Sequence, residues 1–226
     1  MGTLTITGNG TVNARGIYNG YGNGGENVAT AKITIENGTF NPKGTNGGAA
    51  IFNYGIAVIK GGTFTTAGAY SLNNQAGSSM TIDNATVKGG IYNEATSLII
   101  NSGNIQTTRE GYTHAIYHNG GELVVNGGTF MGNGNEVINA NDKVATINDG
   151  TFTKDPNGKT SYLLAGSKMT ILGGTFNAHT SNPAGHPVRP DVIVKGGTFN
   201  YQHKNIADGY TIVDNGNGTW TVTKNE

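Results

Sequence analysis

Apolar and polar residues alternate in short stretches along this chain, and each stretch runs into a corner of the GGTF type. The last apolar residues of successive copies are 18 to 28 positions apart. A period in the low twenties that tolerates insertions is typical of solenoids, in which each repeat forms one coil. The nine copies are Leu4–Val12, Ile33–Phe40, Ala57–Phe64, Met80–Val87, Leu98–Ile105, Leu123–Phe130, Ala145–Phe152, Met169–Phe176 and Val192–Phe199.

Each repeat predicts strands, because its alternation has period two and its residues are mostly Thr, Ile and Val. Glycine pairs such as Gly61-Gly62 and Gly127-Gly128 break helices and allow the positive φ angles of a tight corner. The Phe that follows is the large apolar residue of its segment, so we expect it to point inward. Stacked coils would then place equivalent rings in a ladder of Phe40, Phe64, Phe130, Phe152, Phe176 and Phe199.

A second, weaker pattern lies between the copies and ends in asparagine, as in Ile17-Tyr18-Asn19 and Ile91-Tyr92-Asn93. It adds strands to each coil, and about 23 residues at roughly 3.3 Å each wrap a coil of three sides. At a bend, an Asn side chain binds backbone groups that the corner leaves unpaired. His118 replaces the Asn in one coil. The predicted asparagine ladder is Asn19, Asn53, Asn73 and Asn93.

Over residues 4–199 this pattern resembles the right-handed parallel β-helix of the pectate-lyase-like superfamily. More narrowly, it resembles the Gly/Asn/Thr-rich repeat regions of bacterial surface proteins and phage fibres. The resemblance implies an all-β fold, a single-stranded right-handed parallel β-helix of about nine coils. A repeat consensus shared by proteins of many functions implies little about activity.

The C-terminus predicts a β-hairpin, because two alternating arms flank the Asn-Gly-rich turn of residues 214–218. An open sheet edge would otherwise template aggregation. We therefore divide the chain into a β-helix, residues 1–205, and a capping hairpin, residues 206–226, with Trp220 or Tyr210 closing the last coil. Because the chain starts directly in a repeat, we interpret it as a fragment of a longer protein.

Composition narrows the classes of function. The 226 residues include 38 glycines, no cysteine, and 14 basic and 14 acidic side chains, for a formal net charge of zero. This balance argues against nucleic-acid binding, which requires a basic surface. The sequence has no run of 18 apolar residues that could span a membrane and no signal-peptide pattern at its start.

Enzymes on the resembled fold usually cleave acidic polysaccharides with clustered carboxylates or a calcium site, as the resemblance implies. General acid and base must lie close to the scissile bond, but the carboxylates here are dispersed, and Asp83 and Asp149 are three coils apart. The spacing of His179, His186 and His203 matches no metal motif. We predict no metal and no cofactor.

The best catalytic candidates lie in residues 108–118, where Arg109, Tyr112 and His114 are concentrated. A Tyr/His pair with an Arg offers an acid, a base and charge neutralisation for an alginate-type elimination. The alternative interpretation of this segment is an exposed loop with ordinary polar residues.

Aromatic and aliphatic residues recur at one position of the second pattern and suggest a binding surface. If the residues before them face the core, this column faces outward, because neighbours in a strand point to opposite sides. Ser71 fits poorly in the inward set, so the parity could be reversed. The column is Tyr18, Phe52, Leu72, Tyr92, Tyr117, Ile138 and Leu164, and the predicted binding residues are Tyr18, Phe52, Tyr92, Tyr117 and His118.

Three functions follow from these patterns. The first is a non-enzymatic binding or structural module, extracellular, on a cell surface or on a virion, that presents its faces to glycans or to host or cell-surface proteins as a monomer or homotrimer. The second is a polysaccharide lyase or hydrolase. Ice binding ranks last, because Thr-x-Thr pairs such as Thr219/Thr221 do not recur coil after coil.

Overall fold

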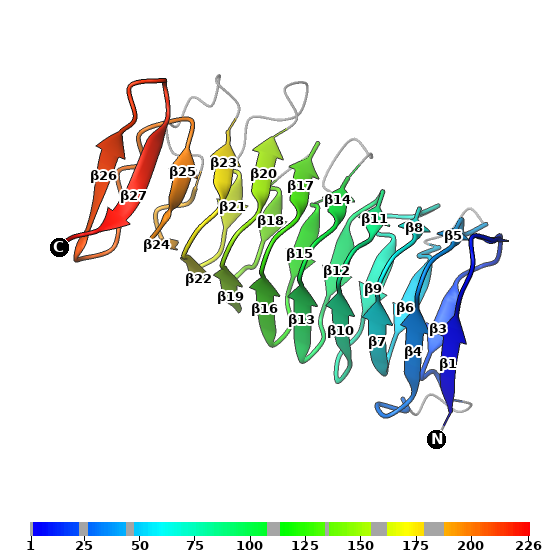
Figure 1. Cartoon of the computed structure of the whole chain (residues 1–226). Helices are drawn as coiled ribbons and strands as arrows, with labels where there is room; N and C mark the ends of the chain where they lie inside the picture. Colours follow the sequence, from blue (N-terminus) through cyan, green and yellow to red (C-terminus); the bar gives the residue numbers. More distant parts are fainter. Residues whose placement is uncertain are drawn as a thin grey trace.

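The computed structural model is an elongated stack of coils (Figure 1) that describes residues 2–22, 27–43, 48–107, 114–133, 136–154, 162–178 and 188–226. Its described residues form strands and no helix. Three sheets of nine, eleven and seven strands run along the stack, one on each side of the coil. The first coil lies at one end and the C-terminal hairpin at the other. The predicted all-β parallel solenoid is therefore confirmed.

Sheet A contains the alternating run that opens each repeat. Its strands are parallel and in register, so that equivalent residues lie over each other, as in the pairing of Met80 with Ala57 and Leu98. Alternate residues are buried and half-exposed, as period two requires. The strands are β1 (Thr3–Ile6), β4 (Lys32–Ile35), β7 (Ile56–Ile59), β10 (Ser79–Ile82), β13 (Ser97–Ile100), β16 (Glu122–Val125), β19 (Val144–Ile147), β22 (Lys168–Ile171) and β24 (Ile193–Val194).

Sheet B follows the glycine corner and contains the Thr-Phe step of each repeat. Its phenylalanines are buried, which confirms the predicted ladder. Phe130, Phe152 and Phe176 stack with ring centroids 4.8 and 5.0 Å apart and planes within 8° of parallel. The strands are β2 (Thr11–Val12), β5 (Thr39–Phe40), β8 (Thr63–Phe64), β11 (Thr86–Val87), β14 (Asn104–Gln106), β17 (Thr129–Gly132), β20 (Thr151–Lys154), β23 (Thr175–Asn177), β25 (Gly197–Phe199), β27 (Trp220–Lys224) and β26 (Tyr210–Asp214).

Sheet C contains the second pattern and closes the coil. Its seven strands correct the expected number of coils. All nine repeats form a strand in sheet A, but the described residues complete the third side in only seven coils. Beyond them, Val188 continues sheet C as an isolated parallel bridge to Leu164. The strands are β3 (Ile17–Asn19), β6 (Ile51–Asn53), β9 (Leu72–Asn74), β12 (Ile91–Asn93), β15 (Ile116–His118), β18 (Ile138–Asn139) and β21 (Leu164–Ala165).

Glycine is required at the corner between sheets A and B. Gly174 has φ of +108°, and a Cβ built there would lie 2.9 Å from the carbonyl oxygen of Gly150 in the preceding coil. A side chain at this position would therefore be strained in its own backbone and would push the coils apart. The GGTF phrase thus combines a corner glycine, replaced by Ala85 in one coil, with the inward Phe.

The C-terminal hairpin covers the last coil. Strand β27 pairs antiparallel with β25 and with β26, so the parallel ladder of sheet B ends in two antiparallel strands. Val222 is buried against the core, while Tyr210 packs partly buried beside it. The predicted hairpin is present, and Val222 is its most deeply buried apolar residue. The division of the chain at residue 205 stays a prediction.

The stacked rings predict a large effect of truncation. Phe152→Ala removes a fully buried ring that touches Phe130 and Phe176, and we expect a loss of about 3–5 kcal/mol in the free energy of unfolding. Met131→Ala, at an exposed outward position on the neighbouring strand β17, should change it by less than about 0.5 kcal/mol. Urea denaturation followed by circular dichroism measures both; equal effects would contradict the ladder.

Candidate functional site

Sheet C carries an outward column of side chains that includes four of the predicted binding residues. Strand pairing places Tyr18 over Phe52, and Tyr92 over Tyr117. Tyr18 is exposed, whereas the other three are half-exposed. In order along the axis, the column is Tyr18, Phe52, Asn73, Tyr92, Tyr117 and Asn139, and the residue at the next position, Ala165, is buried.

Three members of the predicted column were assigned to the wrong side. Leu72, Ile138 and Leu164 pair with the inward isoleucines and are fully buried. Val137 and Leu163, one residue earlier, are also buried. When two consecutive apolar residues are both buried, the sequence does not show which of them occupies the inward position of the strand. For this reason the sequence placed the wrong residue in the column.

The first two coils hold an exposed aromatic cluster, which we call the aromatic quartet: Tyr18, Tyr21, Phe52 and Tyr54. These four side chains line one open surface pocket. Tyr18 stacks on Phe52 with centroids 4.7 Å apart, and Tyr21 tilts against Tyr54 at 5.2 Å. Tyr18 and Tyr21 are 51% and 59% exposed. Tyr21 and Tyr54, which lie just beyond the strands of the column, widen it on this side.

A second aromatic cluster lies at coils four and five. Tyr92 stacks on Tyr117 at 5.6 Å, and Tyr70 and His114 pack against this pair at 5.6 and 5.4 Å. The hydroxyl of Tyr92 donates to Glu94 Oε1 at 2.5 Å. Burial, followed by the bond to Glu94, raises the pKa of Tyr92 to about 12. Burial likewise raises the pKa of Tyr70 to about 12, so both phenols stay protonated at neutral pH.

Beneath the column runs a buried ladder of asparagines that ends in His118. Each side-chain Nδ2 donates to the Oδ1 of the next Asn at 2.7 to 2.8 Å. The amides also bind backbone carbonyls at the bend, as expected; Asn53 donates to Ser79 O at 2.8 Å. Asn74, rather than the predicted Asn73, occupies the third position. The ladder is Asn19, Asn53, Asn74, Asn93 and His118.

His118 is fully buried, so it takes no part in the outward surface to which the sequence assigned it. Asn93 Nδ2 lies 2.8 Å from Nδ1, and Val144 O lies 3.1 Å from Nε2. Because the amide nitrogen only donates, Nδ1 must accept, and the proton must be on Nε2. Burial lowers the pKa of His118, although its contacts with backbone carbonyls oppose this shift.

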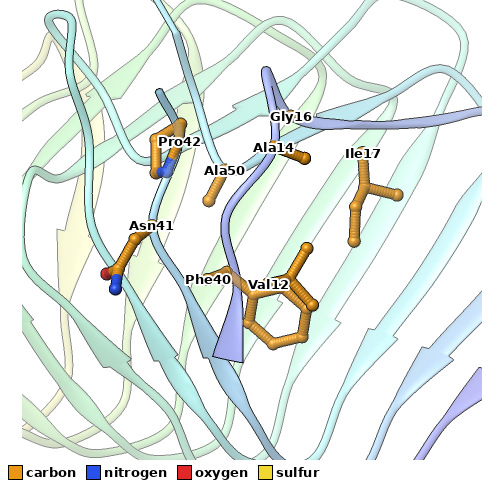
Figure 2. A pocket seen from close by; sticks show the side chains of 8 residues that line it. All are labelled: Val12, Ala14, Gly16, Ile17, Phe40, Asn41, Pro42 and Ala50. Atoms are coloured by element: carbon orange, nitrogen blue, oxygen red, sulfur yellow. The ribbon is translucent and has the colours of Figure 1, made fainter. Parts of the chain in front are cut away.

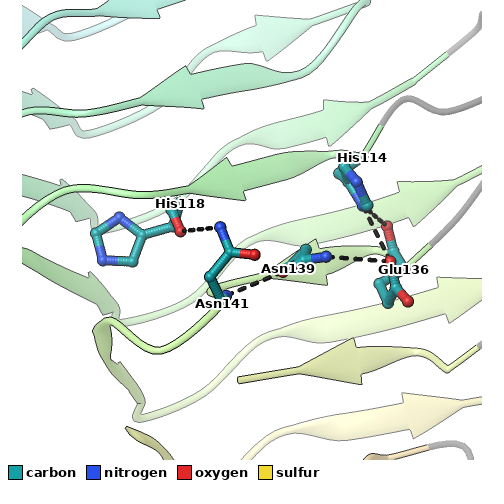
Figure 3. A network of polar contacts seen from close by, with 5 residues as sticks. All are labelled: His114, His118, Glu136, Asn139 and Asn141. Carbon is teal, nitrogen blue, oxygen red and sulfur yellow. Dashed lines mark hydrogen bonds and ion pairs between the residues drawn. The ribbon is translucent and has the colours of Figure 1, made fainter. Parts of the chain in front are cut away.

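A network of polar contacts through Glu136, Asn139 and Asn141 links His114 to the backbone of His118 (Figure 3). The Nδ1 of His114 lies 3.0 Å from Glu136 O and 3.4 Å from Glu136 Oε2, and Asn139 Nδ2 donates to that carboxylate oxygen at 3.4 Å. Burial lowers the pKa of His114, while Glu136 opposes that shift. Arg109 and Tyr112, the other catalytic candidates, lie outside the described residues, as do His179 and His186.

The described residues also include a buried histidine and a small apolar pocket away from the column. No group of three or more His, Asp or Glu side chains with metal-ligand geometry occurs among the described residues. His203 is buried and stacks on Phe199 at 5.8 Å, where it extends the phenylalanine ladder. A small pocket between the first two coils is lined mainly by apolar groups such as Val12, Phe40 and Pro42 (Figure 2).

Sheet B carries an outward row of threonines that the sequence reading missed. The residue after each corner pairs with the equivalent residue of the next strand in the sheet, and nine of these ten positions are Thr. In the described part of the chain, the hydroxyls from Thr39 to Thr175 make no hydrogen bond to protein. The row is Thr11, Thr39, Thr63, Thr86, Asn104, Thr129, Thr151, Thr175, Thr198 and Thr221.

The chain matches no family model, no curated protein and no solved structure. Within the described ranges, no helix is long and apolar enough to cross a membrane. Its candidate sites must therefore be judged on their own geometry.

His118 predicts a pH-dependent stability. Because its pKa in the folded protein lies below the ordinary 6.5, its contribution is complete above pH 6.5 and is lost as the pH falls through the folded pKa. One such group changes the unfolding free energy by at most about 1.4 kcal/mol per pH unit. His118→Asn, which replaces the ring with the amide found elsewhere in the ladder, should reduce this slope.

Urea denaturation at pH 7.5, 6.5 and 5.5 measures the slope in both proteins. His114→Gln serves as the comparison, because it removes the other histidine whose pKa burial lowers. Equal pH slopes in the wild type and in His118→Asn would contradict the lowered pKa of His118 in the folded protein.

Proposed function

We propose that this chain is a non-enzymatic binding module of an extracellular protein, a rigid solenoid that presents the aromatic quartet to glycans. The single observation behind this proposal is the exposure of Tyr18 and Tyr21 beside Phe52 and Tyr54 in one open pocket. Contiguous exposed apolar patches of this kind mark interaction sites. Tyrosine combines an apolar ring face with a polar hydroxyl, which suits the apolar faces and hydroxyl rims of sugar rings.

The form of the fold supports this role. In-register pairing over nine strands of sheet A makes the solenoid a stiff rod, on which the quartet has a fixed place at one end. The quartet lines its pocket without any charged residue, so the pocket favours uncharged sugars over uronates. An enzyme acting on acidic polysaccharides would need charge neutralisation and an acid–base pair at the site.

Alanine substitution in the quartet tests the proposal. On a glycan array, Tyr18→Ala and Tyr21→Ala should each weaken binding of the best ligand about tenfold or more, a loss of about 1.4 kcal/mol. Leu172→Ala is the matched control, since Leu172 is 47% exposed at a corner after sheet A and outside the quartet. Absence of glycan binding, or binding that survives both tyrosine substitutions, would rule the proposal out.

Ice binding is a second candidate, which the threonine row favours. The row repeats a hydroxyl and a methyl group once per coil, about 4.8 Å apart. This spacing is close to that between equivalent oxygen atoms along the a axis of hexagonal ice. The sequence ranked this function last for lack of Thr-x-Thr pairs, but the regular repeat runs across the strands instead of along them.

A charge placed in the row tests this second candidate. Thr129→Lys and Thr151→Lys should abolish inhibition of ice recrystallisation, because each interrupts the row with a long charged side chain. Thr146→Lys, on the outward face of sheet A, should leave the inhibition intact. A wild-type protein that leaves ice grain size unchanged at high concentration would remove this candidate.

A further inference from the structure

The outward column of sheet C has an internal order that the quartet alone does not explain. An aromatic pair, Tyr18 and Phe52, is followed by the amide of Asn73, and a second aromatic pair, Tyr92 and Tyr117, is followed by the amide of Asn139. The two rings of each pair lie nearly parallel, at 10° and 8°. The same two-part unit, a stacked pair and then an amide, therefore occurs twice along the axis.

The spacing of the two units sets the size of a ligand that reaches both. Equivalent positions are three coils apart, which corresponds to about 14 Å at about 4.8 Å per strand. The column from Tyr18 to Asn139 spans about 24 Å on the same estimate. A monosaccharide or disaccharide fits on one unit, whereas only an extended chain lying parallel to the solenoid axis contacts both.

Polar groups beside the column indicate the charge of that chain. Glu94 accepts a hydrogen bond from the hydroxyl of Tyr92 at 2.5 Å, and Glu136 accepts one from the amide of Asn139 at 3.4 Å. Two carboxylates therefore lie next to the second unit. They repel a polyanion such as a polyuronate. Asn73 accepts from Gln75 through Oδ1 at 3.0 Å, and its Nδ2 has no partner within the described residues. That amide is available to a hydroxyl or acetamido oxygen.

We propose that the column binds an extended, uncharged polysaccharide along the solenoid axis, with sugar rings against the two aromatic pairs and a sugar oxygen at the free amide nitrogen of Asn73. This inference rests on the proposed glycan-binding function and adds to it the second aromatic pair, the direction of the chain and the charge class of the ligand. Binding two units of one chain makes the second contact intramolecular, so affinity rises with chain length.

A length series tests the inference. Isothermal titration calorimetry compares disaccharides with hexasaccharides of β-1,4-linked glucose and of β-1,4-linked N-acetylglucosamine. In at least one series, the hexasaccharide should bind the wild type at least tenfold more tightly than the disaccharide. Tyr117→Ala, in the second unit, should abolish that gain and leave disaccharide affinity at the quartet unchanged. Hexagalacturonate should show no gain with length.

The outcomes separate this inference from the proposed function. Disaccharide binding that depends on Tyr18, without any gain for the hexasaccharide, would overturn the extended site and leave the quartet intact. A gain that persists in Tyr117→Ala, or that hexagalacturonate shares, would also overturn it. Tyr117→Ile, which puts another strong strand-forming residue at this position, replaces the alanine variant if circular dichroism shows that the latter is unfolded.

Discussion

Every coil of this protein lies directly over the next, so each inward side chain must pack against a copy of its own position. Few residue types satisfy that constraint. Phenylalanine does so by stacking parallel rings, as between Phe152 and Phe176 at 5.0 Å. Asparagine does so because its amide both donates and accepts. Glycine at the corner is dictated by the same stacking, because the carbonyl of the preceding coil occupies the place of a Cβ. This constraint explains why the same short phrase recurs in the sequence of each coil.

The ends of the ladders follow from the same requirement. In the asparagine ladder, donation runs toward the C-terminus, and the neutral ring of His118 accepts the last bond at Nδ1. The Nε2–H of His118 donates a hydrogen bond to the carbonyl oxygen of Val144, so the ladder ends without an unpaired donor. In the phenylalanine ladder, Val87 and Ile105 fill two central positions, and the antiparallel hairpin ends the sheet after Phe199. The titratable residue His118 thus lies inside the stack, where burial lowers its pKa and disfavours its charged form.

Sequence patterns predicted the strands, the inward phenylalanines and the hairpin, because each depends on local alternation or on a turn rich in glycine. They failed where two adjacent residues share one property. Asn73 and Asn74 are both asparagine, and Val137 and Ile138 are both buried, so neither pair reveals its register. The threonine row was missed for a different reason: it has the same repeat as the phenylalanine ladder, but threonines were sought only as Thr-x-Thr pairs along single strands.

Outward positions are free of the constraint that shapes the core, since solvent accepts any polar or small side chain there. The outward positions of sheet B repeat threonine, whereas the column of sheet C has large aromatic rings at four positions. Exposed aromatic rings are not stabilised by packing in the core, and Tyr18 is about half exposed to solvent. Their stacking on one another, 4.7 Å apart for Tyr18 and Phe52, holds the ring faces in a fixed orientation before any ligand arrives. A preorganised surface binds with a smaller loss of conformational entropy, which is the physical advantage of building a binding site on a solenoid.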